Sequence, residues 1–529
     1  TLAPAIGLGV LLRNVLVARE PLYGLSEWAH RFDERLLGLP PGRTSLLNDD
    51  RVGRCLDALF RADRAALMTA VVVHAVRTFD VDLREVHNDS TTVTFTGQYA
   101  SATGHTVFGH PTHRITQGHN KDHRPDLKQL LYVLTTAADG TVPVWCSVDH
   151  GNTTDDQTHI DTWDTLRRIV GRPDFLYVAD AKLCTKENMA HIARAHGRFI
   201  TVLPKTRRED TWFRDWIQTH EVPWVELLRR ENARRQDGPE EVYRGFESPM
   251  RSIEGYRIVW IWSSQKCAQD QDTRQRQIQR AITELEHLRA RIHAPRSRLK
   301  TLGRIQEAAA AVLAQAKAAR WITTEIRTLD EPHYTQANAG RPGKDTQYVR
   351  HVRQRFELHW EAQADALHYD DRTDGIFPLI LNDDTLSLSQ ALVSYKHQPS
   401  LEKRHEQLKS VFEVMPVLLK TVHRIEAFLF LYFLALLTEA LIEREIRRQM
   451  TAQHIPSLPL YPEGRPCKAP TTDRIFRLLE DVRRHRLIGP GRACQKRFYD
   501  DLTPLQCTVL RLLGLSPTAY FQAGDADAS

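Results

Sequence analysis

Apolar positions in the first half of the chain change their spacing several times. Glu85–Phe95 is rich in Thr and Val and alternates between polar and apolar positions, which predicts a β-strand. Two short apolar runs, Phe175–Ala179 and Phe199–Leu203, have the length and composition of buried strands. Asp155–Val170 and Thr185–His196 have apolar residues three or four positions apart, which predicts helices. Strands and helices in this order predict an α/β fold built on a mixed sheet.

Further elements follow from the same patterns. The apolar segments Gln129–Thr135 and Val142–Val148 flank Ala-Asp-Gly, which predicts a β-hairpin. Tyr256–Trp262 and Phe356–Ala362 are strand candidates, and helix-forming sequence on both sides of Pro295 predicts a helical hairpin.

These patterns divide the chain into five regions. In chain order they are a helical N-terminal region (1–84), a strand-and-helix region (85–205), an insertion with the helical hairpin (206–375), a second strand-and-helix region (376–450) and a basic C-terminal region of short helices (451–529).

One apolar run, Ala427–Leu437, is long enough to raise the question of a membrane span. A span needs about 20 such residues, and Glu426, Glu439 and Glu443 bracket this one. We therefore expect a buried core helix and no membrane association. The chain opens on Thr1, not Met, so we also expect a trimmed or truncated reading frame.

Composition and charge narrow the class of protein. The 7 cysteines are scattered and form no CxxC pair, which is typical of reduced thiols in a cytoplasmic protein and excludes a disulfide scaffold or zinc ribbon. Segments 264–329 and 443–498 each hold 13 Lys and Arg against 6 Asp and Glu. The whole chain carries only +6, so two basic blocks lie in an otherwise acidic chain. That distribution favours a polyanionic partner, although two solvated helical faces would have the same composition.

Three acidic residues stand out by their context. Asp89 lies in the middle of a predicted strand, where a buried carboxylate is costly. Asp180 ends the apolar strand Phe175–Ala179, and active sites of α/β sheets gather at the carboxyl ends of strands. Glu402 lies in a predicted helix that Pro399 opens, and Lys409 shares its face seven residues later. Each acid alone has an ordinary reading as a turn, cap or surface residue.

Together the three carboxylates could bind two Mg²⁺ ions about 3.5–4 Å apart, the arrangement that serves phosphodiester chemistry. Mg²⁺ prefers hard oxygen ligands and keeps several waters, so a few carboxylates suffice. Mn²⁺ is a plausible substitute.

The chain resembles the DDE transposases of bacterial insertion sequences, in the group named after insertion sequence four. Tyr395, Glu402 and Lys409 have the spacing of that group's Tyr-Arg-Glu-Lys signature, and Gln398 stands where the signature has Arg. The segments around Asp89 and Asp180 are similar to those that carry the first two acids of the family. Two intervening segments, His119–Gln129 and Gly151–Asp155, are similar to family landmarks.

The resemblance implies an RNase H-like catalytic domain, formed by 85–205 and 376–450 and interrupted by the insertion subdomain at 206–375. It also implies that Asp89, Asp180 and Glu402 are the catalytic metal ligands. The residues expected to contact DNA are Tyr395, Lys409, Lys121, Arg124 and Lys128.

The function expected from the resemblance is Mg²⁺-dependent cleavage at transposon ends and strand transfer into target DNA. The partners would be double-stranded DNA, as terminal inverted repeats and target, and a second copy in a homodimeric DNA complex in the bacterial cytoplasm. We expect the N-terminal helices, the insertion and the C-terminal region to bind the transposon end. Within the insertion, we expect the helical hairpin to present six arginines to the DNA: Arg274, Arg280, Arg289, Arg291, Arg296 and Arg298. Two alternatives stay open: an RNase H-like nuclease or resolvase without strand transfer, and a non-catalytic DNA-binding transposase remnant.

Overall fold

The computed structural model describes residues 2–231, 238–411, 419–489 and 494–522. It confirms an α/β protein with a mixed sheet, in which nine strands are joined in the order β5-β4-β1-β6-β7-β13-β10-β9-β8. The strands are β1 (Glu85–Phe95), β4 (Lys128–Ala137), β5 (Pro143–Asp149), β6 (Leu176–Ala179), β7 (Arg198–Val202), β8 (Val225–Arg230), β9 (Glu241–Glu247), β10 (Arg257–Ser263) and β13 (Ile376–Leu381).

The chain divides into two compact units. The first comprises Thr1–Val202, Ile380–Leu386 and Gln390–Ser529, and the second comprises Leu203–Leu379 and Ser387–Ser389.

Strand β1 is the centre of the first unit's part of the sheet. It pairs with β4 in antiparallel register, with Asp89 opposite Leu134, and with β6 in parallel register, with Asn88 opposite Ala179. Strands β4 and β5 form the predicted hairpin, and Gly140 in its turn has a φ of 71°, which a glycine adopts without strain. The helices within residues 1–202 of this unit are α1 (Pro4–Val17), α2 (Leu25–Ala29), α3 (Asp49–Arg61), α4 (Arg64–Phe79), α5 (His159–Val170) and α6 (Lys186–Arg194).

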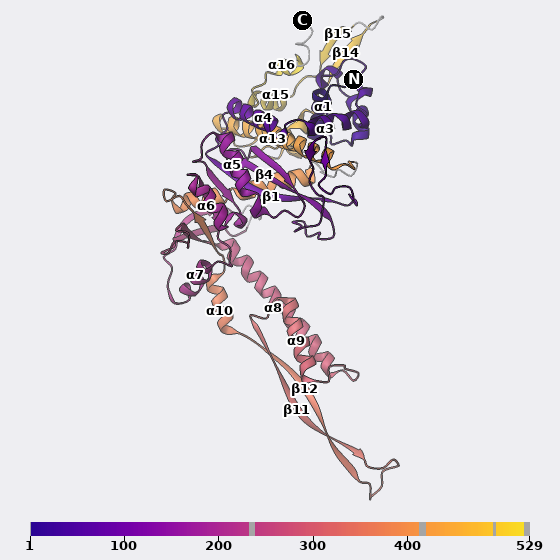
Figure 1. Ribbon diagram of the computed structural model, residues 1–529, viewed down its shortest axis with the longest axis vertical. Helices are drawn as coiled ribbons and strands as arrows, with labels where there is room; N and C mark the ends of the chain where they lie inside the picture. The colour runs from indigo at the N-terminus through magenta and orange to yellow at the C-terminus, as the bar shows by residue number, and fades with distance from the viewer. Residues whose placement is uncertain (1, 232–237, 412–418, 490–493, 523–529) are drawn as a thin grey trace. The chain divides into compact units, whose positions relative to one another are not determined.

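The long helix α13 (Val422–Ala452) contains the apolar run of the sequence. Among the described residues it is the one helix long and apolar enough to cross a membrane, but 72% of its most apolar window is buried in the protein. It packs against α1, α3 and β5, and Figure 1 shows it between the sheet and the N-terminal helices. The expectation of a buried core helix is therefore confirmed, because other parts of the protein cover most of the apolar side chains of α13.

Two further helices, α11 (Leu388–Tyr395) and α12 (Gln398–Glu406), follow β13, and α12 packs against β1. The prediction that Pro399 opens the helix of Glu402 is confirmed, because Pro399 lies in the first turn of α12.

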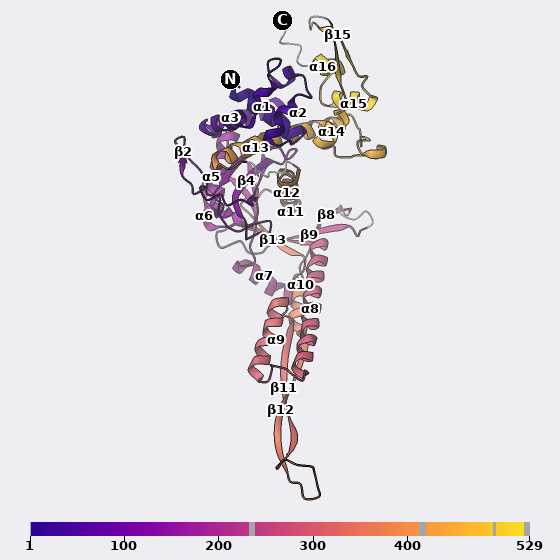
Figure 2. The same ribbon diagram turned by 90° about the vertical axis from the view of Figure 1, so that its right-hand side faces the viewer.

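The second unit contains a helical hairpin and a long two-stranded ribbon. Helices α8 (Ser264–His293) and α9 (Leu302–Ala316) lie on the two sides of Pro295, as the sequence predicted. The ribbon consists of β11 (Ile322–Gln336) and β12 (Tyr348–Ala362), and Figure 2 shows it running along the two helices and beyond them. Only the end of β12 was predicted as a strand. The other helices of this unit are α7 (Arg208–Thr219) and α10 (Ala364–Thr373).

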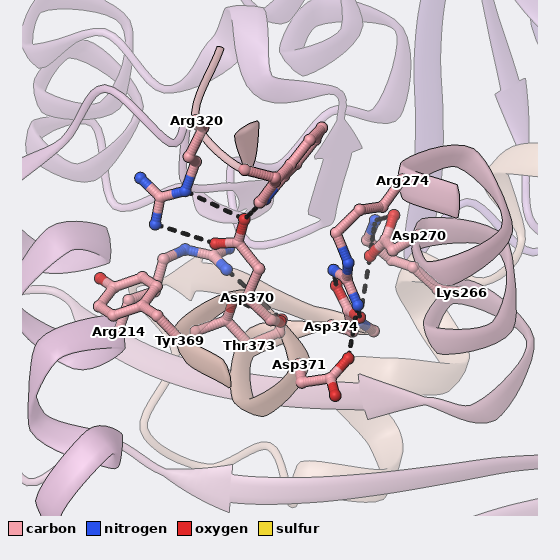
Figure 3. A network of polar contacts seen from close by, with 12 residues as sticks. Arg214, Lys266, Asp270, Arg274, Arg320, Tyr369, Asp370, Asp371, Thr373 and Asp374 are labelled. Carbon is pink, nitrogen blue, oxygen red and sulfur yellow. Dashed lines mark hydrogen bonds and ion pairs between the residues drawn. The ribbon is translucent and has the colours of Figure 1, made fainter. Parts of the chain in front are cut away.

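A network of ion pairs fixes the base of α8 to the segment around α10 (Figure 3). Arg274 is only 8% exposed, and its guanidinium lies 2.7 Å from a carboxylate oxygen of Asp374 and 2.5 Å from one of Asp371. Lys266 pairs with Asp270 in the same network. The expectation that Arg274 faces DNA is therefore wrong, because this side chain is itself buried and neutralises the buried carboxylate of Asp374 in its own unit.

The C-terminal region differs from the prediction of helices alone. Helices α14 (Thr472–Leu479), α15 (Pro504–Leu512) and α16 (Pro517–Gln522) accompany a hairpin of β14 (Arg484–Ile488) and β15 (Cys494–Tyr499). The hairpin pairs His485 with Phe498, and their rings stack with centroids 5.0 Å apart. Aromatic pairs of this kind stabilise antiparallel strands, and the helical prediction did not consider them.

A candidate active site of clustered carboxylates

Asp89 and Asp180 lie at the same level on neighbouring strands of the first unit. Strands β1 and β6 are parallel and pair Asn88 with Ala179. Asp89 directly follows Asn88, and Asp180 directly follows Ala179. Asp180 follows the end of β6 and accepts a hydrogen bond from the backbone N–H of Lys182 at 2.9 Å, which caps the short helical turn Ala181–Leu183. The sheet therefore places two carboxylates side by side at the carboxyl end of β6.

A third carboxylate belongs to this cluster. Asp155 begins a short helical turn before α5 and is in electrostatic contact with both Asp89 and Asp180. Burial raises the pKa of Asp89, and the negative charge of Asp155 raises it further, although Lys121 opposes the shift. Burial likewise raises the pKa of Asp180, and the charge of Asp89 adds to it. The site thus contains more negative charge than its own positive groups compensate.

Lys121 is the positive group inside this cluster. Its ammonium lies 2.9 Å from Asp155 Oδ2 and 3.5 Å from Asp89 Oδ1, and donates to the carbonyl oxygen of Ser90 at 2.6 Å. Burial disfavours its charge, but Asp89, Asp155 and Asp180 together raise the pKa of Lys121, so it is protonated. Lys121 therefore supplies one positive charge within a group of three carboxylates.

The sequence around Lys121 folds it into this position. The side-chain oxygen of buried Asn120 accepts hydrogen bonds from the backbone N–H groups of Asp122 and Arg124, at 2.8 and 3.1 Å. Its amide nitrogen donates to Gln129 at 2.8 Å. This local network fixes the loop before β4. It also explains what the segment His119–Gln129, which the sequence singled out, does in the fold: its hydrogen bonds hold Lys121 in place.

Glu402 lies on α12, which packs against the strand of Asp89. The side-chain amide of Gln398, in the first turn of α12, donates to the carbonyl oxygen of Asn88 at 3.4 Å, beside Asp89. Arg404 of α12 is 5% exposed and lies 3.0 Å from a carboxylate oxygen of Glu443 in α13. These two contacts hold α12 between β1 and α13 and leave the side chain of Glu402 exposed.

The three predicted acids, Asp89, Asp180 and Glu402, all affect the pKa of Tyr395. Burial and the negative charges of Asp180, Glu402 and Asp89 raise the pKa of its phenol to about 12. The carboxylates of Asp89, Asp180 and Glu402 therefore all act electrostatically on one phenol, although they are far apart in the sequence.

His405 is a further residue of the site that sequence reasoning missed. Its ring is 6% exposed, and Nε2 lies 3.8 Å from Asp89 Oδ2. Burial and the charges of Lys121 and Lys409 lower the pKa of His405 to about 3, so the ring is neutral. Its position one turn after Glu402 was the available signal. For Asp155, the signal was its place at the end of the segment Gly151–Asp155.

The other predicted DNA-contact residues have these partners in the free protein. Lys409, in the π-helical segment Gln407–Val411, lies 2.6 Å from Asp122, next to Lys121. Arg124 is exposed and lies 2.7 Å from Asp126. Lys128 donates to the carbonyl oxygen of Gln98.

The donor set fits a hard divalent cation in its chemistry. Carboxylate oxygens are the ligands that Mg²⁺ and Mn²⁺ prefer, and here Asp89, Asp155 and Asp180 share a single lysine. As the side chains lie, no three His, Cys, Asp or Glu residues in the described part of the chain form a ready-made metal group. The ammonium of Lys121 lies beside Asp89 and Asp155.

Comparison with known proteins adds no assignment: neither the protein-family models nor the curated proteins contain a match to the chain.

Proposed function

We propose that the chain is a DNA transposase of the DDE type, with Asp89, Asp180 and Glu402 as its catalytic carboxylates. In this proposal the first unit contains an RNase H-like catalytic domain and the second unit is an insertion. The partners are double-stranded DNA and, in the DNA complex, a second copy of the chain. The compartment is the bacterial cytoplasm.

The observation that carries the proposal is the set of three carboxylates around Tyr395. They come from β1, from the end of β6 and from α12, in the chain order that the resemblance implies. A structural role explains the neighbouring group of Asp89, Asp155 and Asp180 poorly, because three carboxylates that share one lysine repel one another and destabilise the folded chain. Such excess charge is typical of a site that binds a cation or a phosphate.

The residues have separate tasks in this mechanism. Asp89, Asp180 and Glu402 would hold two divalent cations, Mg²⁺ or Mn²⁺. When bound, these ions supply an activated water or 3′-hydroxyl and stabilise the leaving oxygen of a phosphodiester. Arg404 positions α12 through Glu443, and so positions Glu402. Lys121 and Lys409 supply positive charge for the phosphate, and each would exchange a carboxylate partner of the free protein for DNA.

Lys121 also favours one alternative, a DNA-binding remnant of a transposase that uses no metal. An ammonium beside Asp89 and Asp155 is what a chain would contain if a lysine had permanently replaced the cation. The two functions make different predictions for the same assay.

The test uses DNA that flanks this gene, which should carry inverted repeats. Duplexes of these ends, with a plasmid target, are incubated with the full chain in Mg²⁺, in Mn²⁺ and in EDTA. The proposal predicts metal-dependent cleavage at the repeat ends and joining of cleaved ends to the plasmid. Asp180→Asn should abolish both reactions and retain end binding. The control, Asp174→Asn, removes an exposed carboxylate from the same unit and should change neither.

Other outcomes contradict the proposal in distinct ways. Metal-dependent cleavage with no joined product indicates a nuclease or resolvase. Binding of the ends with no cleavage in either metal indicates the remnant.

A further inference from the structure

The ribbon of β11 and β12 is anchored only at its base. Ile322 and Leu358 are buried in one apolar cluster with α8 and α9, and Phe356 is also buried. Figures 1 and 2 both show the ribbon continuing beyond the ends of these helices within the second unit. A two-stranded ribbon without further support is marginally stable in water, so a ribbon of this length indicates a partner.

The outer ribbon, which we define as residues 327–355, is almost entirely exposed. Only Gln336 and Thr346 among its residues are partly covered. Its exposed side chains include large apolar and aromatic groups as well as charged ones: Leu329, Tyr334, Tyr348, Val349 and Val352 are each at least 44% exposed. Exposed groups of this size, gathered on one projecting element, are typical of an interaction surface.

The charge of the outer ribbon identifies the chemistry of that partner. It holds six Lys and Arg against three Asp and Glu. Arg327 and Arg355 pair with Glu325 and Glu331. The remaining four cations have no carboxylate partner among the described residues and lie at the tip and along β12: Arg341, Lys344, Arg350 and Arg353.

Three cations of the helical hairpin are already engaged within the second unit. Arg274 is buried in the ion pairs of Figure 3, and Arg276 lies 2.8 Å from Asp272. The guanidinium of Arg289 lies 4.8 Å from the ring centroid of Trp360. Four other arginines of the hairpin that the sequence assigned to DNA contact are exposed and serve as the comparison for the ribbon: Arg280, Arg291, Arg296 and Arg298.

We propose that the outer ribbon binds duplex DNA. A two-stranded β-ribbon fits the major groove, its right-handed twist can follow the groove, and unpaired arginines and a lysine can contact the flanking phosphates. The inference rests on the proposed function only in naming DNA as the polyanion. A second copy of the ribbon is the less favoured partner, because two such ribbons carry the same positive charge and repel each other.

The test compares two variants of the full chain that lose equal charge from the same unit. The ribbon variant combines Arg341→Ala, Lys344→Ala, Arg350→Ala and Arg353→Ala. The hairpin variant combines Arg280→Ala, Arg291→Ala, Arg296→Ala and Arg298→Ala. Affinity for a short mixed-sequence duplex is measured in EDTA over a range of salt concentrations, and circular dichroism checks the fold.

The ribbon variant should bind more weakly and lose up to about 3.6 units of the slope of log K against log salt, or about 0.9 per lost phosphate contact. The hairpin variant should lose less than about one unit by the same measure. Equal losses in the two variants, or an unchanged slope in the ribbon variant, would overturn the inference. So would sedimentation showing a dimer that only the ribbon variant loses while its DNA binding is retained. The assay needs no metal, so failure of the cleavage mechanism does not affect it.

Discussion

Each unit contains a group of neighbouring aspartates, and the two groups differ in how their charge is balanced. In the second unit, Asp270, Asp370, Asp371 and Asp374 have Lys266, Arg274 and Arg320 as partners, at 2.5 to 3.0 Å. In the first unit, Asp89, Asp155 and Asp180 share Lys121.

Balance of charge, more than burial, distinguishes the two groups. Burial raises the pKa of Asp374 as it does that of Asp89, so the shift alone does not identify a site. Asp374 has a guanidinium at 2.7 Å that opposes the shift, whereas the cation nearest Asp89 is shared with two other acids. The paired group holds elements together, and the under-compensated group is suited to bind a cation from outside.

Asp89→Asn should have the largest effect on activity. If Asp89 is one member of a set that acts as a unit, metal-dependent cleavage should fall by about 10⁴-fold. The melting temperature should be unchanged or higher, because one of three repelling carboxylates is removed. Cleavage and thermal unfolding are measured on the same preparation, and a variant that loses both together would indicate a structural role.

Asp374→Ala, in contrast, should lower the stability of the protein. It leaves the buried guanidinium of Arg274 without the carboxylate that accepts two of its hydrogen bonds, which should lower the free energy of unfolding by about 3–5 kcal/mol. Urea denaturation measures this. The control Asp272→Ala removes the partner of exposed Arg276 and should cost less than about 1 kcal/mol. Equal losses in the two variants would mean that the network of Figure 3 contributes no more than a surface pair.

Lys121→Met should sharpen the comparison by removing the internal cation. Mn²⁺ should bind about tenfold more tightly, since the ion no longer competes with an ammonium for Asp89 and Asp155. In EDTA the melting temperature should fall, because the carboxylates then repel one another unopposed. Calorimetric titration with Mn²⁺ measures the affinity, and unchanged binding would show that Lys121 does not occupy the cation's place.

The pair of Glu439 and Glu443 in α13 is an intermediate case, because the two share Arg404. Burial and the charge of Glu443 raise the pKa of Glu439 to about 8, above its ordinary value of 4.5. The folded protein therefore takes up a proton first as the pH falls, and the free energy of unfolding rises. The gain should be about 1 kcal/mol from about pH 9 to about pH 7. Glu439→Gln should abolish this gain, and a gain that persists in the variant would place the titrating group elsewhere.

The sequence predicted elements where apolar spacing is strong and missed them where it is weak. Strand β1 was predicted with its observed bounds because Thr and Val alternate along it. Strand β11 was missed because an exposed ribbon has no apolar period, and β14 because its arginines favoured a basic helix.

Candidate site residues could be selected from the sequence where the residue type and its position in a predicted element identified them. Asp89, Asp180 and Glu402 could be selected from strand ends and signature spacing. The ion pair of Arg274 with Asp374 joins residues 100 positions apart, and the contact of Lys121 with Asp155 depends on how two loops fold. No regular spacing in the sequence indicates either contact, so neither could be predicted without the structure.

The most direct test of the account is Mn²⁺ binding to the full chain, followed by the electron paramagnetic resonance signal of the free ion. The account predicts binding by the unmodified protein and at least about tenfold weaker binding in Asp180→Asn and in Glu402→Gln, equivalent to about 1.4 kcal/mol each. Glu187→Gln, an exposed carboxylate on α6, should have no effect. An unmodified protein that binds no Mn²⁺, or a Glu402→Gln variant that binds as tightly as the unmodified protein, would contradict the claim that three separate segments form one cation site.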